Sequence, residues 1–338
     1  MTASQGNAPM PHGARTGEAL HLVFPSLPES AAEEIAQTYR YGMTEFEEEM
    51  QSLCTQLGYR PAPHHIDLSN YAAVLEAIPV EERIFYLCDG NEEDDGVCGL
   101  SPVLHMERLK RPMIAAGSMF WRNTTHKSVM KRLFAAADVP TPGYCHLTEG
   151  DALPDFQDLQ YPLFVKPDAL YGSVGISDAS VLHSEEEARE RLPALRERYR
   201  SVLVEEFVRG REFTVFLLGD GAVFAMAERR FDTQLPPWQR FISYERSWVD
   251  LAVAYPYRAV EDRRDQEALG QVARAAFYAV QGDQYARVDI RQQEDTGAFL
   301  ALEVNSMPGL GLDGSVGECA RVCGRTMLDV IQQILLRR

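Results

Sequence analysis

The fold is decided by Tyr285-Ala-Arg-Val-Asp-Ile-Arg291 and by Phe299-Leu-Ala-Leu-Glu-Val-Asn-Ser-Met-Pro-Gly309. Both runs alternate between polar and apolar residues, and a short polar turn containing Asp-Thr-Gly separates them. Alternation with a period of two on either side of a turn predicts a β-hairpin.

This hairpin is expected to have two chemically different faces. If Asp289 lies opposite Glu303, side-chain parity places the polar residues on one face. These are Arg287, Asp289, Glu303 and Asn305, and the apolar face then holds Val288, Ile290, Leu302 and Val304. Two carboxylates and an amide oxygen brought together favour a hard cation such as Mg²⁺ between them. The alternative, for the hairpin alone, is an ordinary solvated face.

The composition limits the class of protein. A chain of 338 residues has room for two or three domains, and 45% hydrophobic with 25% charged residues is typical of a soluble globular protein. The net charge of −17 argues against a broad nucleic-acid or anionic-membrane surface, so we expect small-molecule partners. No apolar run has the length of a membrane span, and residues 1–18 are expected to be a disordered tail.

The six cysteines, at 54, 88, 98, 145, 319 and 323, have no repeated spacing. Cys319 and Cys323 are four residues apart on a predicted helix, but no second pair of metal ligands is nearby. We therefore expect buried free thiols rather than a zinc site or disulfides. Free thiols indicate a reducing compartment, and hence a cytoplasmic protein.

Residues 19–123 alternate between apolar strand-like runs and helical patterns, which predicts an open α/β sheet of the Rossmann-like kind. The expected elements are strands at 20–25, 83–88 and 112–116 and a helix within 29–57. The acidic loop 88–96 follows a strand, where α/β sheets commonly carry binding residues. Its run of carboxylates favours a solvated loop instead.

A second unit begins with a helix for which Thr124 or Thr125 is the expected N-cap. Lys127 falls in its first turn, where the helix dipole disfavours a cation. A lysine there could bind an anion, and a solvated lysine is the alternative.

Lys166 ends a buried strand, and a small-residue loop at 169–177 follows it. The lysine would supply a charge for phosphates, while the loop around Gly172, Ser173 and Gly175 would supply N–H groups and a hydroxyl. The order differs from GxxxxGK[ST], because the lysine precedes the glycines. The alternative for the loop alone is an ordinary hairpin turn.

The rest of the chain is expected to mix strands and helices. Strands at 201–208, 212–218 and 222–228 predict an antiparallel meander, whose Glu205, Glu206 and Glu212 could face a nucleoside. The irregular segment 231–250 is a candidate lid. Helices are expected at 184–199, 262–281 and 318–336.

Taken in order, these motifs resemble the ATP-grasp superfamily, and in particular D-alanine–D-alanine ligase-like enzymes. The similarity runs from about 124 to 310 and includes Val-Lys-Pro, Gly-Ser-Val-Gly-Ile-Ser, Val-Glu-Glu-Phe, Arg-Glu-Phe-Thr-Val, Ala-Arg-Val-Asp and Glu-Val-Asn-Ser-Met-Pro-Gly. The resemblance implies an α/β substrate domain at 19–123, a central ATP-grasp subdomain at 124–204 and a C-terminal subdomain with the metal site at 205–338.

The resemblance also implies roles for individual residues. Phosphates would be bound by Lys127 and Lys166 under a loop of Gly172, Ser173 and Val174. Adenine would be read by the hinge Glu205, Glu206, Phe207 and Val208, and the ribose by Glu212. The metal ligands would be Asp289, Glu303 and Asn305, for two Mg²⁺ ions or alternatively Mn²⁺. Arg287 would donate to the oxyanion. Arg287 and Ser173 would be the catalytic residues.

Enzymes of this kind use ATP to convert a carboxylate to an acyl phosphate, from which an amine displaces phosphate. The resemblance further implies a homodimer as one assembly. Rival interpretations are an authentic D-alanine–D-alanine ligase with an unusual N-terminal domain and an ATP-binding regulatory protein without chemistry.

Three departures from the family pattern concern the substrates. Residues 22–36 lack a Gly-Gly-x-Ser-x-Glu type motif, and 310–315 differ from the family's acceptor site. In the lid, Ser247 and Trp248 stand where relatives usually carry a Lys-Tyr pair. We therefore expect a conserved ATP half with altered substrate pockets, and substrates other than two D-alanines.

Overall fold

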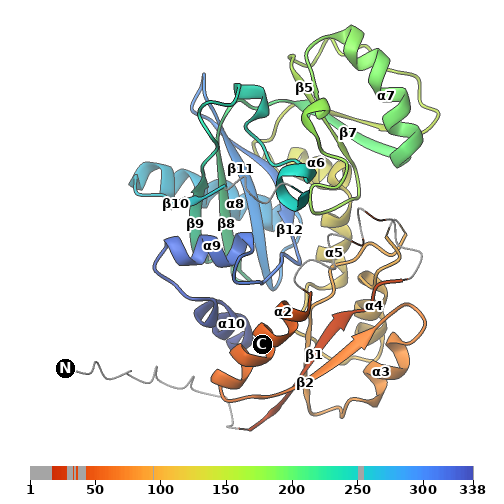
Figure 1. Cartoon of the computed structure of the whole chain (residues 1–338), viewed down its shortest axis with the longest axis vertical. Coiled ribbons are helices and arrows are strands. Elements are labelled where there is room, and N and C mark those ends of the chain that lie inside the picture. Colours follow the sequence, from red (N-terminus) through yellow and green to blue (C-terminus); the bar gives the residue numbers. More distant parts are fainter. Residues whose placement is uncertain are drawn as a thin grey trace.

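The computed structural model describes residues 17–28, 33, 36, 43–93, 95–249 and 255–337. These residues form three sheets with flanking helices, and Figure 1 shows the parallel N-terminal sheet at the opposite end from α7. The expected tail lies outside the described residues except for its last two positions, and so does most of the predicted helix before residue 43.

The N-terminal unit has a parallel sheet of order β2-β1-β3, which confirms the predicted open α/β class. Its strands are β1 (Ala19–Pro25), β2 (Arg60–Ile66) and β3 (Arg83–Tyr86), and its helices are α2 (Met43–Gln56), α3 (Tyr71–Ala77) and α4 (Leu100–Arg108). The third strand predicted at 112–116 was wrong, because only Ile114 bridges to Phe85. The sequence analysis missed β2, an edge strand whose two prolines need no partner on their outer side.

Two helices lead into the central unit, α5 (Ser118–Thr125) and α6 (Lys127–Ala136). The predicted N-cap was wrong, since Thr124 and Thr125 end α5 and their hydroxyls donate to carbonyls within it. His126 occupies the N-cap position of α6 without a capping hydrogen bond from its side chain, and Lys127 is the first residue of the helix.

The central unit is an antiparallel sheet of order β4-β7-β5-β6, with α7 (Glu185–Tyr199) packed against it. Its strands are β4 (Tyr144–Thr148), β5 (Leu163–Pro167), β6 (Val181–Leu182) and β7 (Ser201–Glu206). The predicted meander was therefore wrong at its first strand, because β7 pairs with β4 and β5 and not with the strand that follows it.

The C-terminal unit is an antiparallel sheet of order β10-β9-β8-β11-β12. Its strands are β8 (Gly210–Leu218), β9 (Val223–Arg229), β10 (Tyr257–Ala259), β11 (Tyr285–Gln293) and β12 (Phe299–Asn305). Its helices are α8 (Arg263–Ala279), α9 (Ser315–Val322) and α10 (Met327–Leu336). The single helix predicted at 318–336 is thus two, separated where Gly324 adopts a positive φ.

The predicted register of the hairpin is confirmed, since Asp289 pairs with Glu303 and Arg287 with Asn305. A bulge then shifts the pairing, so that Ile290 lies opposite Ala301. Ala301 is fully buried, whereas Leu302 lines a cavity. The expectation that Leu302 belongs to the apolar face was therefore wrong, because the extra residue of the bulge reverses the alternation.

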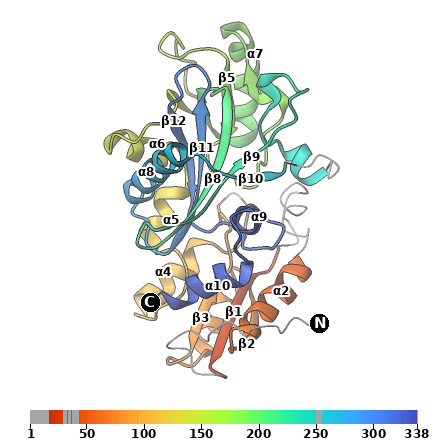
Figure 2. The ribbon, with the colours of Figure 1, turned by 90° about the vertical axis from the view of Figure 1, so that its left-hand side faces the viewer.

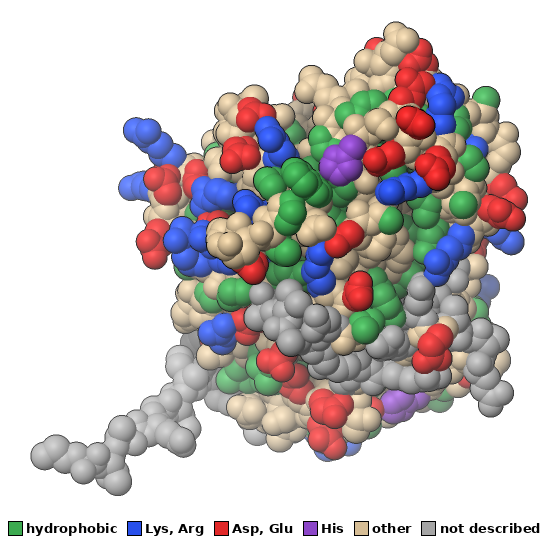
Figure 3. All heavy atoms as spheres, turned by 45° about the horizontal axis from the view of Figure 1, so that its top comes forward, with side chains coloured by type: hydrophobic (Ala, Val, Ile, Leu, Met, Phe, Trp, Pro, Cys, Tyr) green, Lys and Arg blue, Asp and Glu red, His purple; other side chains and the backbone are tan. Residues whose placement is uncertain are grey.

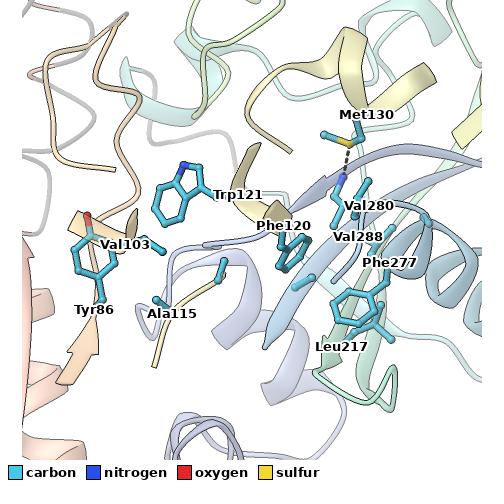
Figure 4. Packing of buried hydrophobic residues seen from close by; sticks show 14 of the residues in the cluster. Tyr86, Val103, Ala115, Phe120, Trp121, Met130, Leu217, Phe277, Val280 and Val288 are labelled. Carbon is cyan, nitrogen blue, oxygen red and sulfur yellow. Dashed lines mark hydrogen bonds between the residues drawn. The ribbon is translucent and has the colours of Figure 1, made fainter. Parts of the chain in front are cut away.

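The two faces of the C-terminal sheet are covered differently. One face packs against α8, α5 and α6, and Figure 4 shows Phe120, Met130 and Phe277 in this layer. On the other face, α9 packs against β8, β9 and β10, and α10 belongs to the same buried cluster. Beyond them the face lines a cavity. Figure 2 shows α9 and α10 between this sheet and the parallel N-terminal sheet.

Charge is mixed over the molecular surface. On the face in Figure 3, acidic and basic side chains are interspersed. Among the described residues, no helix combines the length and the apolar character needed to cross a membrane.

Candidate active site

A cavity of about 830 Å³ lies between the three sheets. Its wall includes the end of β1, the loop after β3, the glycine loop that follows β5, the polar face of the β11–β12 hairpin and the segment after β12. This volume is within the range of small-molecule sites. Every site residue predicted from the sequence lines this one cavity: Lys127, Lys166, Gly172, Ser173, Val174, Glu205, Glu206, Phe207, Val208, Glu212, Arg287, Asp289, Glu303 and Asn305.

The predicted metal ligands converge on the floor of the cavity. Asn305 Nδ2 lies 3.2 Å from Asp289 Oδ2 and 3.4 Å from Glu303 Oε1. Arg287 Nη2 lies 2.9 Å from Asp289 and 3.9 Å from Glu303. Although burial opposes ionisation, the positive charges of Lys127, Lys166 and Arg287 lower the pKa of Glu303.

These residues fit a hard divalent cation. Two carboxylates and an amide provide up to three oxygen-bearing ligands on one strand pair. Asn305 donates its N–H group here, and a rotation of the amide would present its oxygen to the same point. No cluster of three or more His, Cys, Asp or Glu side chains suited to a metal occurs in the described ranges, so the amide is needed to complete this set.

Opposite the floor, Glu205 is held between two buried lysines. Lys166 Nζ lies 2.7 Å from one carboxylate oxygen, and Lys131 Nζ lies 2.9 Å from the other. Burial disfavours the charged carboxylate, but the two lysines outweigh it and lower the pKa of Glu205 to about 2. The side chain expected to face the nucleoside is therefore already engaged by two cations.

The sequence analysis missed Lys131. This residue is fully buried and also donates to Thr141 Oγ1 at 2.6 Å, while Thr141 donates to the carbonyl of Ala301 at 2.7 Å. Burial lowers the pKa of Lys131 to about 8. Its position four residues after Lys127, on the same side of one helix, was a usable signal.

Lys127 and the glycine loop are adjacent, as predicted. Lys127 Nζ donates to the carbonyl of Leu170 at 2.7 Å, and burial lowers the pKa of this lysine. Ser173 and both glycines of the loop have positive φ angles. A side chain at Gly175 would come within 2.6 Å of Pro167, so the close turn requires glycine there.

The predicted hinge connects β7 to β8. The N–H groups of Glu206 and Phe207 donate to Gly143 and Pro162, and the carbonyl of Val208 accepts from Arg291 at 2.7 Å. The Glu206 carboxylate accepts from the N–H of Gln160 at 2.9 Å. Phe207 packs near Phe164 and Phe241, which forms an aromatic corner at this end of the cavity.

Glu212 is flanked by two arginines that the sequence analysis did not single out. Arg291 Nε donates to one oxygen at 3.1 Å, and Arg229 Nε lies 3.5 Å from the other. Arg229 also contacts Tyr257 and lies 3.4 Å from the Ser315 hydroxyl. The parity that placed Arg287 and Asp289 on the polar face would also have placed Arg291 there.

The lid segment, defined here as residues 231–249, folds back onto the glycine loop. Arg246 forms two hydrogen bonds with Asp178, at 2.6 and 2.8 Å. The indole N–H of Trp248 donates to the carbonyl of Gly172 at 2.7 Å. The final residue of the predicted lid, Asp250, lies outside the described residues.

The half of the cavity nearest the N-terminal unit is acidic. Its wall includes the carboxylates Glu45, Glu49, Asp89, Asp95 and Asp313. Asp89 and Asp95 belong to the loop 88–96, for which a solvated loop and a loop that carries binding residues were the alternatives, and both residues line the cavity. Asp95 accepts from two backbone N–H groups of the loop, which shapes the wall at this point.

A family model described as "D-ala D-ala ligase C-terminus" matches residues 133–336. The chain belongs to the D-alanine–D-alanine ligase family. Two relatives named D-alanine–D-alanine ligase support this membership. The protein from Alcanivorax borkumensis is 31% identical, over 80% of this chain and 85% of its own length. The one from Chromohalobacter salexigens is 30% identical, over 77% of this chain and 78% of its own length.

Solved structures of this family share the fold of most of the chain. A D-alanine–D-alanine ligase from Bacillus anthracis covers 95% of this chain with a TM-score of 0.73 and 18% identity. The same enzyme complexed with ATP covers 95% with a TM-score of 0.69 and 16% identity. As a member of the D-alanine–D-alanine ligase family, the chain is an ATP-dependent enzyme that joins a carboxylate to an amine and releases ADP and phosphate.

Proposed function

We propose that this ligase activates the carboxylate of an amino acid, or of a similar acid, as an acyl phosphate and transfers the acyl group to an amine in the described cavity. The observation that carries the proposal is the convergence of Asp289, Glu303 and Asn305 with Lys127 and Lys166 on one cavity. In this arrangement the lysines can bind the negatively charged triphosphate, and the acids can hold cations between it and the substrate carboxylate.

The lysines are assigned to the phosphate groups. Lys127 and Lys166 are both buried. Burial lowers the pKa of Lys127 although the charge of Glu303 opposes it, whereas for Lys166 burial is outweighed by the charges of Glu205 and Glu303, which raise the pKa. A triphosphate between the two lysines would exchange these protein contacts for phosphate contacts. The loop of Gly172, Ser173 and Val174 would close over the phosphates, with the Ser173 hydroxyl as a donor.

The metal site is assigned to Asp289, Glu303 and Asn305, for Mg²⁺ with two ions bound, and Mn²⁺ as the alternative. When bound, the ions supply positive charge that offsets the γ-phosphate. This chain's own residues hold the ligands in place, because Arg287 and Thr214 both bond to Asp289. Arg287 is also the assigned donor to the oxyanion of the tetrahedral intermediate.

The nucleoside is assigned to the other end of the cavity. The hinge from Glu205 to Val208 would bind adenine through its backbone, and Glu212 would accept from the ribose. Glu205 itself is committed to Lys131 and Lys166, so we assign it to fixing the lysines as well as to the base.

A second candidate function is authentic D-alanine–D-alanine ligation, which the printed names of the relatives favour. Against it stand the lid residues Ser247 and Trp248, which differ from the usual Lys-Tyr pair, and the acidic wall. We therefore propose that the substrates are not two D-alanines. The six free cysteines support a cytoplasmic setting.

The test is phosphate release from ATP in pooled acids and amines, with mass detection of the product and D-alanine alone as a separate arm. We expect an amide product and stoichiometric phosphate from a pair other than two D-alanines. A product from D-alanine alone at a comparable rate would establish the second candidate. Absence of ATP turnover with every pool would contradict both.

A further inference from the structure

Arg291 is a buried arginine to which the proposed chemistry gives no role. It lies on β11, two residues after Asp289, and only 4% of its surface is exposed. It nevertheless lines the cavity. A buried guanidinium needs several hydrogen-bond acceptors, so the identity of those acceptors indicates what it holds together.

The three nitrogens of Arg291 bond to three different parts of the nucleotide end. Nε donates to Glu212 Oε2 on β8 at 3.1 Å, and Nη1 donates to the carbonyl of Val208 in the hinge at 2.7 Å. Nη2 donates to the carbonyl of Arg240 in the lid segment. One planar group therefore connects the assigned ribose ligand, the adenine hinge and the lid segment.

Aromatic contacts of Arg291 also join the hinge to the lid segment. The guanidinium lies 5.3 Å from the ring centre of Phe207 in the hinge and 5.7 Å from that of Phe231 in the lid segment. Such cation–π contacts are favoured when the cation is desolvated. A lysine carries one nitrogen and could not reach all three acceptors at once.

Glu212 depends on this arrangement. It is buried, and its two oxygens face Arg291 on one side and Arg229 on the other. An ionised carboxylate has about four lone-pair directions, so sites remain for ribose hydroxyls after both contacts are made. Without Arg291 the carboxylate would be free to rotate toward Arg229.

The lid segment is fixed at a second place, on the glycine loop. There Trp248 bonds to Gly172, and Arg246 bonds to Asp178 directly after the loop. Arg291 supplies the contact at the nucleoside end. The lid segment is thus held on both sides of the cavity, at the glycine loop assigned to the phosphates and, through Arg291, at the end assigned to the nucleoside.

We infer that Arg291 is a positioning residue that orients Glu212 for the ribose and fixes the lid segment to the adenine hinge, so that recognition of the ribose and closure of the lid depend on one side chain. The inference rests on the proposed assignment of this end of the cavity to the nucleoside.

The test compares Arg291→Met and Arg291→Lys with wild type. Calorimetry would give dissociation constants for the magnesium complexes of ATP, 2′-deoxy-ATP and 3′-deoxy-ATP, and limited proteolysis with and without ATP would follow cleavage of the lid segment. Arg211→Met is the matched control, because Arg211 lies on the neighbouring strand opposite Gln292 and bonds two carboxylates without lining this cavity.

For wild type we expect at least one deoxynucleotide to bind roughly tenfold more weakly than ATP, since a hydrogen bond to a charged group is lost. Arg291→Met should weaken ATP binding by about the same factor, and the ratio of the deoxynucleotide and ATP dissociation constants should fall toward one. The lid segment of this variant should remain cleavable with ATP present. Arg291→Lys keeps a charge beside Glu212, so it should retain part of the preference but not lid protection. Arg211→Met should match wild type in every measurement.

An equal loss of affinity for all three nucleotides, with the preference and the lid protection unchanged, would overturn the inference and leave Arg291 a structural residue. Wild-type behaviour of Arg291→Met would do the same. If Arg291→Met does not fold, Arg291→Lys decides, and full lid protection in that variant would overturn the inference. Failure of the wild-type protein itself to bind ATP would instead contradict the proposed function, which separates the two cases.

Discussion

Glu205 accepts from Lys166 at 2.7 Å in a buried ion pair, and Lys131 lies 2.9 Å from its other oxygen. The paired lysines lower the pKa of this carboxyl from 4.5 to about 2 in the folded protein, against the effect of burial. The resulting stabilisation is present above about pH 4.5 and is lost as the pH falls toward 2. We expect Glu205→Gln to lower the free energy of unfolding by about 3 kcal/mol at pH 7, because two buried lysines lose their anion.

Urea unfolding of wild type and Glu205→Gln between pH 7 and pH 3 checks this expectation. The difference between the two should shrink as the pH falls, and Glu206→Gln on the adjacent residue should follow wild type. A difference that does not depend on pH would show that the carboxyl is not held ionised by the lysines.

The metal assignment predicts a loss of turnover without a loss of folding. Asp289→Asn and Glu303→Gln each remove one anionic ligand, and we expect turnover to fall by ~10²-fold or more. Binding of Mn²⁺ in the presence of a nonhydrolysable ATP analogue, followed by electron paramagnetic resonance, should weaken in parallel. Circular dichroism and thermal melting should remain close to wild type. Wild-type turnover in either variant would contradict the assignment.

The contacts of the lid segment predict that loosening the lid changes the ratio of phosphate released to amide formed. Asp178→Asn weakens the pair with Arg246, and Trp248→Phe removes the indole donor to Gly172. A looser lid admits water to an acyl phosphate, so we expect more phosphate released per amide formed, by roughly two- to tenfold. Glu185→Gln, which breaks an exposed ion pair with Arg189 on α7, is the control. An unchanged ratio of phosphate to amide in both lid variants would show that these contacts do not exclude water.

Because of the bulge, we expect alanine substitutions at two nearby positions of β12 to lower stability by different amounts. Val304 is buried in the core, so Val304→Ala should cost about 1–3 kcal/mol of stability and leave ATP affinity nearly unchanged. Leu302 lines the cavity, so Leu302→Ala should cost less than about 1 kcal/mol and weaken ATP binding several-fold. Chemical denaturation and calorimetry measure the two effects. The reverse order would place Leu302 in the core, as simple alternation suggests.

The sequence was sufficient for the hairpin, because alternation and a single turn determine which side chains share a face. It predicted the pairing of Asp289 with Glu303 and the convergence of distant motifs on one site. It did not predict the bulge, since the extra residue depends on packing against neighbouring strands and not on local pattern. Leu302 was misplaced for that reason.

Other features depended on tertiary contacts that one sequence does not reveal. β2 contains Pro61, Pro63 and two histidines, a composition that suggests a loop unless its place at a sheet edge is known. Thr124 and Thr125 have the chemistry of helix caps, yet they end one helix just before another begins. The sequence did not indicate a role for Arg291 and Arg229, because a charged residue on a strand is usually solvated. Only the fold shows that these two are enclosed.

The central claim, that the enzyme activates a carboxylate as an acyl phosphate in this cavity, is tested most directly by isotope transfer. The acid substrate identified by the screen would be labelled with oxygen-18 in its carboxylate, and the released phosphate would be analysed by mass spectrometry. The account predicts one labelled oxygen in the phosphate for each amide formed. Phosphate without label, at full product yield, would contradict it.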